Sequence, residues 1–350
     1  MVTVLVAILG LSLLVIVHEG GHYLAARAFG MRVTRFSIGF GPVLASWTPK
    51  GSPTTFQVCA IPFLAYVMIS GMNPMEEVDP DDPELYPNKG VFARIVTIFG
   101  GPFANYIAAS AMIFVVAVVG WPVDAIPTEP MVVDRIFPDT PAEKAKLQVG
   151  DVIREAHGRP IKNVEELIEV TKARANQPTV YLVERDGERL PPMTITPEKA
   201  PDGRGVIGVT AKHKTIYEAM PVGDAASKAF VYPFTLTVLT LEGIGHMIRE
   251  RTSKGMIGPV GMAELVAEQA DKGAKPLVFI LIQISVALGF FNLLPFPALD
   301  GGRLVFLGYE LVTRRRPNER IEAMVHGVGL LFLLGVIVLV TWRDLLKIFT

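Results

Sequence analysis

The chain has 350 residues, enough for about two domains of ordinary size. Half of its residues are hydrophobic, only 19% are charged against about 25% in soluble proteins, and the mean hydropathy is +0.40. These values exclude an ordinary soluble protein and intrinsic disorder. The net charge of -1 gives no reason to expect a nucleic-acid partner, and the single cysteine, Cys59, excludes an intramolecular disulfide and a cysteine-based zinc site.

Hydrophobic residues gather in four stretches that carry almost no charge. About 20 apolar residues cross the ~30 Å hydrocarbon core of a bilayer, so each stretch predicts a transmembrane helix. The stretches are Val2–Val17, Ile95–Gly120, Leu277–Leu299 and Val325–Val340. A signal peptide is the alternative for the first, but it has no basic region in front and no convincing cleavage site.

Arginines in the short loops predict the orientation of these helices. They follow the first span and separate the last two, at Arg27, Arg32 and Arg35 and at Arg314, Arg315, Arg316 and Arg320. By the positive-inside rule both loops are cytoplasmic. The N-terminus and the long segment between spans two and three then lie outside the cytoplasm.

One further segment, Phe230–Gly245, is apolar enough to be considered as a fifth span. Pro233 interrupts it and Glu242 ends it early, so an interfacial helix is the preferred interpretation. A fifth span would also place the last arginine cluster outside, against the charge rule.

The extramembrane segments predict two further structures. Val33–Ser70 alternates β-branched and aromatic residues around Gly51-Ser52-Pro53, which predicts a hairpin at the membrane surface. Met72–Gly90 is acidic and proline-rich and is interpreted as a linker or mobile cap. From Met131 to Lys212, strand and helix patterns alternate as in a compact α+β module. Its DTPAEKAKLQVGDVIREAHGRPI and YLVERDGE strings resemble a PDZ domain.

The predicted fold is a polytopic α-helical membrane protein with four transmembrane helices, a membrane-associated β-hairpin region and an inserted α+β PDZ-like domain. The first half divides into 1–30, helix 1; 31–93, a cytoplasmic-side membrane-associated β region and linker; and 94–120, helix 2. The second half divides into 128–212, the PDZ-like domain; 213–276, an interfacial amphipathic segment; 277–312, helix 3; and 323–343, helix 4.

The first span ends in His18-Glu19-Gly20-Gly21-His22. On a helix, residues i and i+4 project about 40° apart, so His18 and His22 face one point and Glu19 lies beside it. In this pattern two imidazoles bind Zn²⁺, and the carboxylate acts on a zinc-bound water. The alternative, two hydrogen-bonded helix histidines with a caged glutamate, leaves three costly polar groups inside a spanning helix unexplained.

A hydrolytic zinc site needs a third protein ligand and an open position. The best candidate is Asp300, a lone carboxylate in the apolar run Asn292–Gly302, where Pro295 and Pro297 break the helix. A helix-capping aspartate is the alternative. With four spans, helices 1 and 3 both run from outside to inside, so His18, ~24 Å along helix 1, and Asp300 are expected at one depth.

These motifs, HEGGH, GGPFAN at Gly100–Asn105 and NLLPFPALDGG, resemble the site-2 protease family of intramembrane zinc metalloproteases. The inserted module makes the chain similar to the bacterial branch typified by the regulator-of-sigma-E protease. The resemblance implies that His18, His22 and Asp300 bind one zinc ion and that Glu19 is the catalytic base. It also implies that Asn292 contacts the substrate backbone or stabilises the oxyanion.

The predicted function is therefore hydrolysis of peptide bonds within or near transmembrane segments. The resemblance implies a single-span membrane protein as substrate, such as an anti-sigma-factor-like regulator, and a bacterial inner membrane as location. A peptide or C-terminus at the PDZ-like domain is a further expected partner, beside the alternative that the module only packs or blocks access. A membrane zinc-binding or zinc-transport protein and an inactive PDZ scaffold remain alternatives.

Overall fold

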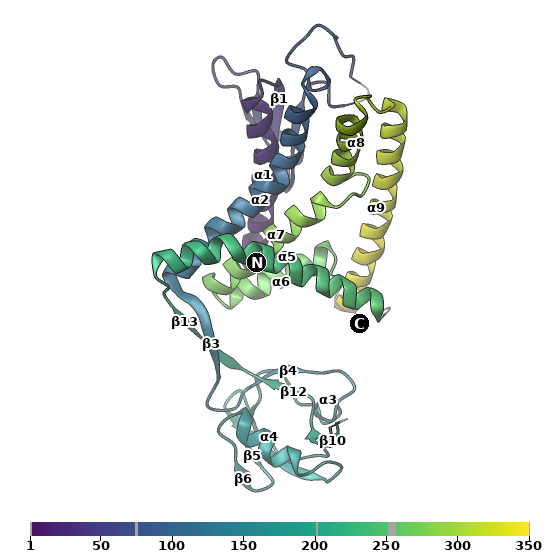
Figure 1. The fold of residues 1–350 in the computed structure, drawn as a ribbon. Helices are drawn as coiled ribbons and strands as arrows, with labels where there is room; N and C mark the ends of the chain where they lie inside the picture. Colours follow the sequence, from purple (N-terminus) through teal and green to yellow (C-terminus); the bar gives the residue numbers. More distant parts are fainter. Residues whose placement is uncertain (1, 74–75, 201, 251–256, 350) are drawn as a thin grey trace. The chain divides into compact units, whose positions relative to one another are not determined.

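The computed structural model describes residues 2–73, 76–200, 202–250 and 257–349. The chain forms two compact units (Figure 1). One combines Met1–Val119 with Met220–Thr350, and the other is Gly120–Ala219. We call them the membrane unit and the inserted unit.

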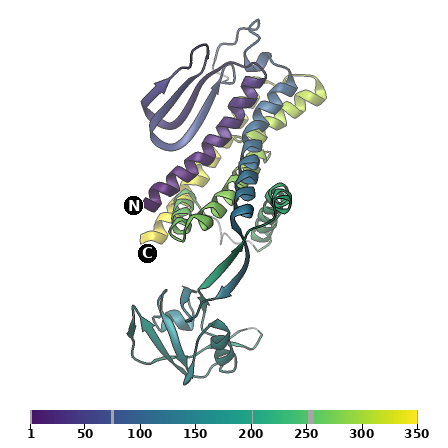
Figure 2. The same cartoon turned by 90° about the vertical axis from the view of Figure 1, so that its left-hand side faces the viewer.

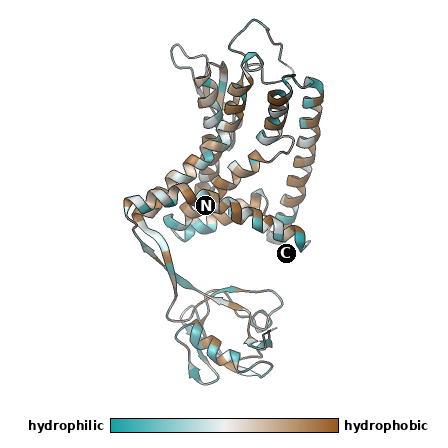
Figure 3. Cartoon of the chain, in the orientation of Figure 1, coloured by the Kyte–Doolittle hydropathy of each residue, from teal (hydrophilic) through white to brown (hydrophobic). Residues whose placement is uncertain are grey.

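Four helices of the membrane unit are long and apolar enough to cross a bilayer. They are α1 (Val2–Ala28), α2 (Val91–Gly120), α7 (Ala274–Leu293) and α9 (Glu319–Phe349). Hydrophobic residues run along their length in Figure 3. These helices correspond to the four predicted spans. Both chain ends lie at one end of this unit in Figure 1, while the α8–α9 connection lies at the other, as an even number of crossings requires.

The third span is interrupted where the two prolines predict a break. Helix α7 ends at Leu293 and α8 (Asp300–Thr313) begins after six intervening residues. Proline lacks an N–H and its ring clashes with the preceding turn, so Pro295 and Pro297 stop the helix. Asp300 therefore stands at the first position of a new helix, beside the break rather than inside a continuous span.

Strands β1 (Val33–Trp47) and β2 (Thr55–Ile69) form the predicted hairpin region. Both strands are strongly bent, so that Phe36 of β1 is paired with Phe56 and with Val67, in two different stretches of β2. The resulting sheet lies along α1 (Figure 2). Tyr23 of α1 packs edge-on against Phe36 and Phe56, which fixes the sheet beside the second half of that helix.

The described part of the predicted linker is tied to the start of the hairpin. Arg32 forms ion pairs with Asp82 and Glu84, each at 2.9 Å, and Leu85 is buried just before the short 3₁₀ helix η1 (Tyr86–Asn88). These contacts attach the described residues of this segment to the membrane unit.

Two more helices complete the membrane unit. Helix α5 (Val222–Arg249) continues through Pro233, and α6 (Pro259–Asp271) packs on α1. By length and composition, α5 does not qualify as a membrane span in the described part of the chain. Tyr106 of α2 holds it through a 2.7 Å hydrogen bond to the hydroxyl of Thr237.

The inserted unit has its own core and sheet. Its helices and strands agree with the α+β order that the sequence predicts, and Tyr181, Ile153 and Met131 are buried at its centre. Asn163 caps α4 by accepting the N–H of Glu166. The elements are β4 (Val133–Ile136), α3 (Pro141–Lys144), β5 (Val152–Ala156), β6 (Arg159–Pro160), α4 (Val164–Lys172), β7 (Thr179–Arg185), β8 (Glu188–Arg189), β9 (Met193–Ile195), β10 (Glu198–Lys199), β11 (Gly205–Val206) and β12 (Val209–Ala211). Within the five-stranded sheet the order is β6-β5-β7-β8, with β9 also on β7, and β12 pairs with β4.

The inserted unit is wider than the predicted 128–212. Strand β3 (Trp121–Pro127) pairs antiparallel with β13 (His213–Glu218) and adds a two-stranded ribbon to it. The prediction that 213–276 begins as an interfacial helical segment is thus wrong for its first residues, which complete a strand pair instead. The paired residues of the two strands lie 86 to 97 positions apart in sequence, so local sequence could not indicate the pairing.

Candidate metal centre

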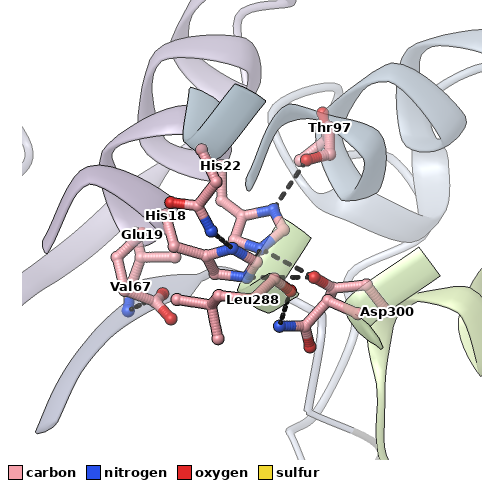
Figure 4. Close-up of polar contacts among 9 residues, drawn as sticks. His18, Glu19, His22, Val67, Thr97, Leu288 and Asp300 are labelled. Atoms are coloured by element: carbon pink, nitrogen blue, oxygen red, sulfur yellow. Dashed lines mark hydrogen bonds and ion pairs between the residues drawn. The ribbon is translucent and has the colours of Figure 1, made fainter. Parts of the chain in front are cut away.

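The predicted histidines face each other from neighbouring turns of α1 (Figure 4). Nε2 of His18 lies 3.3 Å from Nε2 of His22, and both side chains are about 7% exposed. Oδ2 of Asp300 lies 3.1 Å from the first nitrogen and 3.3 Å from the second. His18 and Asp300 are 282 residues apart in sequence. Helices α1 and α8 thus bring two nitrogens and one oxygen to a common point.

Two glycines after Asp300 allow its helix to start so close to the break. A Cβ at Gly301 would overlap the carbonyl oxygen of Leu294, and one at Gly302 would crowd the carbonyl oxygen of Phe296. The first turn of α8 is therefore folded against the proline-containing connection, which carries the Asp300 carboxylate toward α1.

The donor set fits a zinc ion. Four ligands in a tetrahedron with bonds of ~2.0–2.1 Å lie about 3.3–3.4 Å apart, close to the three separations in this cluster. Imidazole nitrogen and carboxylate oxygen are both zinc ligands, and three of them leave one coordination position open. Among the residues that the structure describes, this is the group of His, Cys, Asp and Glu side chains that could hold a metal ion.

Helix α2 holds the other nitrogens of both rings. Nδ1 of His22 lies 2.8 Å from the carbonyl oxygen of Thr97, so this nitrogen carries the proton and leaves the Nε2 lone pair free. The fully buried Asn105 amide lies against Nδ1 of His18, with Nδ2 at 3.1 Å. Turned the other way, its Oδ1, which has no partner among the described residues, would accept the proton of that nitrogen.

Small residues let α1 and α2 approach closely enough for these contacts. A Cβ at Gly21 would overlap the carbonyl oxygen of Gly100, and a Cβ at Gly101 would overlap the ring of His22. The GGPFAN stretch therefore supplies the close helix crossing and the amide behind His18. The motif alone indicated a family resemblance, whereas the structure gives its physical role.

Glu19 lies next to the cluster and is held from the hairpin. The backbone N–H of Val67, in β2, donates to Oε2 of Glu19 at 3.1 Å (Figure 4). The carboxylate thus has one fixed oxygen, and it stands on the same helix turn as the metal-facing histidines. Sequence reasoning had no signal for Val67, because the contact uses only its backbone.

Asn292 makes a local contact in this structure. Its Nδ2 donates to the carbonyl oxygen of Leu288, one turn back in α7, at 2.9 Å. Its role toward a substrate stays a prediction.

The remaining histidines lie outside the cluster. His157, His213 and His246 have other polar neighbours. His326 accepts the backbone N–H of Ala298 in the proline-containing break.

Three relatives resemble the chain over nearly all of their length. A protein named as a candidate zinc metalloprotease in Nostoc sp. is 34% identical, covering 95% of this chain and 93% of the relative. Another from Fusobacterium nucleatum is 32% identical, covering 99% of both. Metalloprotease MmpA of Caulobacter vibrioides is 32% identical, covering 96% of this chain and 93% of its own.

Among solved structures, the PDZ domain of an SdrC-like protein from Listeria monocytogenes covers 25% of this chain and 93% of that domain, with 21% identity and a TM-score of 0.22. A likeness of this extent carries no conclusion about ligands. The family model of peptidase family M50 matches residues 6–336. With the HEGGH histidines and Asp300 brought together in space, the chain belongs to peptidase family M50, the site-2 protease family of zinc metalloproteases.

Proposed function

We propose that this metalloprotease is an intramembrane endopeptidase with one zinc ion held by His18, His22 and Asp300. The observation that carries the proposal is the position of this cluster: His18 and His22 lie on a helix of spanning character with Glu19 beside them, and Asp300 follows the break after another such helix. Polar and ionisable groups are costly in such helices and are generally functional.

The residues present supply the parts that amide hydrolysis needs. When bound, zinc polarises the scissile carbonyl and lowers the pKa of a coordinated water. Glu19 takes a proton from the attacking water and returns it to the leaving amine, which is general base and then general acid catalysis. Val67 N–H keeps one oxygen of that carboxylate in place. The Asn292 amide, freed from Leu288, steadies the tetrahedral oxyanion.

The neighbouring strand suits an extended substrate. A peptide in a membrane is normally helical, and its carbonyl groups are hydrogen-bonded, so it must unwind before it is cleaved. Val67 directs its N–H toward Glu19, so this part of β2 offers a backbone group on the catalytic side of the sheet. Strand addition along Ala65–Val67 would hold the substrate extended beside the site.

Substrates, location and further partners follow from the same proposal. We expect single-span membrane proteins, such as an anti-sigma-factor-like regulator, as substrates in a bacterial inner membrane. The N-terminus and the inserted unit would lie outside the cytoplasm, in line with the loop arginines. A peptide or C-terminus is the proposed ligand of the PDZ-like inserted unit.

Cleavage of a model single-span substrate by wild type and Glu19→Gln, with zinc content measured in both, tests the proposal. We expect the variant to lose cleavage by about 10²–10⁴-fold while it retains zinc. The matched control is Glu169→Gln on the exposed surface of the inserted unit, which should cleave like wild type. Zinc binding without cleavage by wild type would favour a zinc carrier, and a protein that neither cleaves nor binds zinc would favour a scaffold.

A further inference from the structure

Helix α9 contacts the break between α7 and α8 at three successive residues. Ala298, Pro297 and Phe296 meet His326, Gly329 and Phe332 respectively, which lie on one face of α9 at intervals of three residues. The break therefore lies along a stripe of this helix, and the last of the three contacts, at Ala298, is two residues before the proposed zinc ligand Asp300.

The contact to Ala298 is a hydrogen bond at a strained position. Ala298 has φ +76, in the left-handed region that residues with a side chain adopt only when neighbours support it. Its N–H donates to Nδ1 of His326 at 3.0 Å. The His326 ring also packs against Phe306 of α8, with 5.7 Å between ring centres. The imidazole thus joins α9 to the residues on both sides of Asp300.

At Pro297 the contact is between the backbone of α9 at Gly329 and the proline residue. A Cβ at Gly329 would overlap Cβ of Pro297 and approach its carbonyl carbon and oxygen at 2.8 Å. Gly327, two residues earlier on α9, has open space around it. The glycine at 329 therefore sets how closely α9 approaches the break, whereas the one at 327 does not.

Much of the rest of α9 is not covered by protein. Large apolar side chains along it are more than half exposed in the chain, among them Val328, Leu331, Val338 and Leu339. Helix α9 also packs on α6 near its other end, so the contacts with the break are those that hold its first half.

We propose that His326 is a positioning residue for the metal centre. By accepting the Ala298 N–H it holds the break in the conformation that presents Asp300 to His18 and His22. The inference rests on the proposed zinc site. It assigns to the fourth span a part in building that site, although the span supplies no ligand.

Two isosteric replacements separate this role from simple packing. In His326→Asn, Oδ1 occupies the place of Nδ1 and can accept the Ala298 N–H. In His326→Gln, the side chain is one methylene longer, so its amide oxygen no longer stands at the place of Nδ1. The Ala298 N–H then has no acceptor from this residue. We expect His326→Gln to raise the zinc Kd, measured by chelator competition, about 10–100-fold, as is usual when a group that orients a ligand is lost. His326→Asn should stay close to wild type.

The absorption spectrum of the Co²⁺-substituted protein gives a readout that does not depend on activity. His326→Gln should weaken the visible bands of four-coordinate cobalt, and His326→Asn should preserve them. Gly329→Ala, with Gly327→Ala as its matched control, tests the same contact without changing the histidine. We expect the first to raise the zinc Kd and the second to leave it unchanged.

A further control weakens the packing of α9 at a point distant from the break. Asp344, near the other end of α9, accepts the N–H of Gly261 in α6 at 3.0 Å. Asp344→Ala should lower the melting temperature without changing the zinc Kd. The proposal is overturned if His326→Gln binds zinc like wild type, or if Asp344→Ala raises the Kd equally. A wild-type protein that binds no zinc would refute the proposed function itself.

Discussion

His18 and His22 are each held at the ring nitrogen that is turned away from Asp300. For His22 the partner is the backbone carbonyl of Thr97, which a side-chain substitution does not remove. For His18 it is the side chain of Asn105, whose backbone carbonyl in turn accepts the hydroxyl of Ser285 in α7. Groups that hold ligating histidines in this way fix the ring orientation and the tautomer.

Asn105→Ala should therefore weaken zinc binding, with a Kd raised about 10–100-fold. Chelator competition on the purified protein measures this change. Asn292→Ala is the matched control, because that amide donates to Leu288 of its own helix. It should keep the wild-type zinc Kd and lose cleavage, whereas equal zinc affinities in Asn105→Ala and wild type would contradict the positioning of His18.

The buried hydroxyl of Tyr181 gives a prediction about the stability of the inserted unit. Tyr181 is fully buried, and its Oη has no hydrogen-bond partner among the described residues. An unpaired buried hydroxyl costs about 1–3 kcal/mol. Tyr181→Phe removes that hydroxyl and keeps the ring. We expect a free energy of unfolding at pH 7 that is unchanged or raised by about 1 kcal/mol, measured by denaturant unfolding.

The same residue makes stability depend on alkaline pH. Burial raises the pKa of Tyr181 to about 12, while the unfolded chain ionises it near pH 10. Because the folded pKa is the higher one, burial of the neutral ring leaves the free energy of unfolding at its full value below pH ~10 and lowers it as the pH rises toward 12. Wild type should therefore lose more stability than Tyr181→Phe between pH 10 and 12. Parallel pH curves for the two proteins would exclude this contribution.

Sequence reasoning identified the side chains of the centre but not the groups that hold them. His18 and His22 follow from helical spacing, and Asp300 from a lone carboxylate beside two prolines. Thr97 and Val67 act through backbone atoms, which every residue has, so no pattern marks them. His326 stands at the start of an apolar span after a basic loop, which is typical of an interfacial histidine. Only the path of the chain through the break reveals its partner.

At the scale of elements, the crossing of α1 and α2 depends on glycines with different surroundings. Gly21 faces the backbone of Gly100, whereas Gly20 has no neighbouring atom within 4 Å of where a Cβ would stand. The helix positions follow from sequence, because the apolar runs, of 16 to 26 residues, are close to bilayer length. Their crossing does not, because HEGGH contains two adjacent glycines and local sequence does not show which of them faces α2.

Gly21→Ala should therefore lower the free energy of unfolding by about 1–3 kcal/mol, since a methyl group is forced into a packed backbone crossing. Gly20→Ala should be neutral or raise stability by about 1 kcal/mol, because alanine favours helix more than glycine does. Unfolding of both variants in detergent micelles provides the comparison. Equal destabilisation would show that the crossing is not as close as these contacts require.

At the scale of the whole molecule, all the residues of the metal centre belong to the membrane unit. The two chain segments that form this unit meet where the chain enters and leaves the inserted unit. There the N–H of Met220 donates to the carbonyl oxygen of Ala117 at 2.9 Å. The sequence predicted an insertion between spans two and three. It placed the boundaries too narrowly, because the β3–β13 ribbon joins residues far apart in the chain.

Replacing Gly120–Ala219 by a short Gly-Ser linker should leave the zinc Kd equal to that of the full chain. The excised segment should melt cooperatively, because it has its own buried core. Metal titration of the shortened protein and thermal unfolding of the excised segment are the measurements. Loss of zinc binding on deletion would mean that the inserted unit helps to build the centre.

The adjoining exit and return points also determine how mechanical load travels. One of the two covalent attachments of the inserted unit is the end of α2, and this same helix carries Thr97 and Asn105 behind the imidazoles. Pulling on the inserted unit, as a bound ligand anchored elsewhere would do, therefore loads the element that orients both imidazole rings.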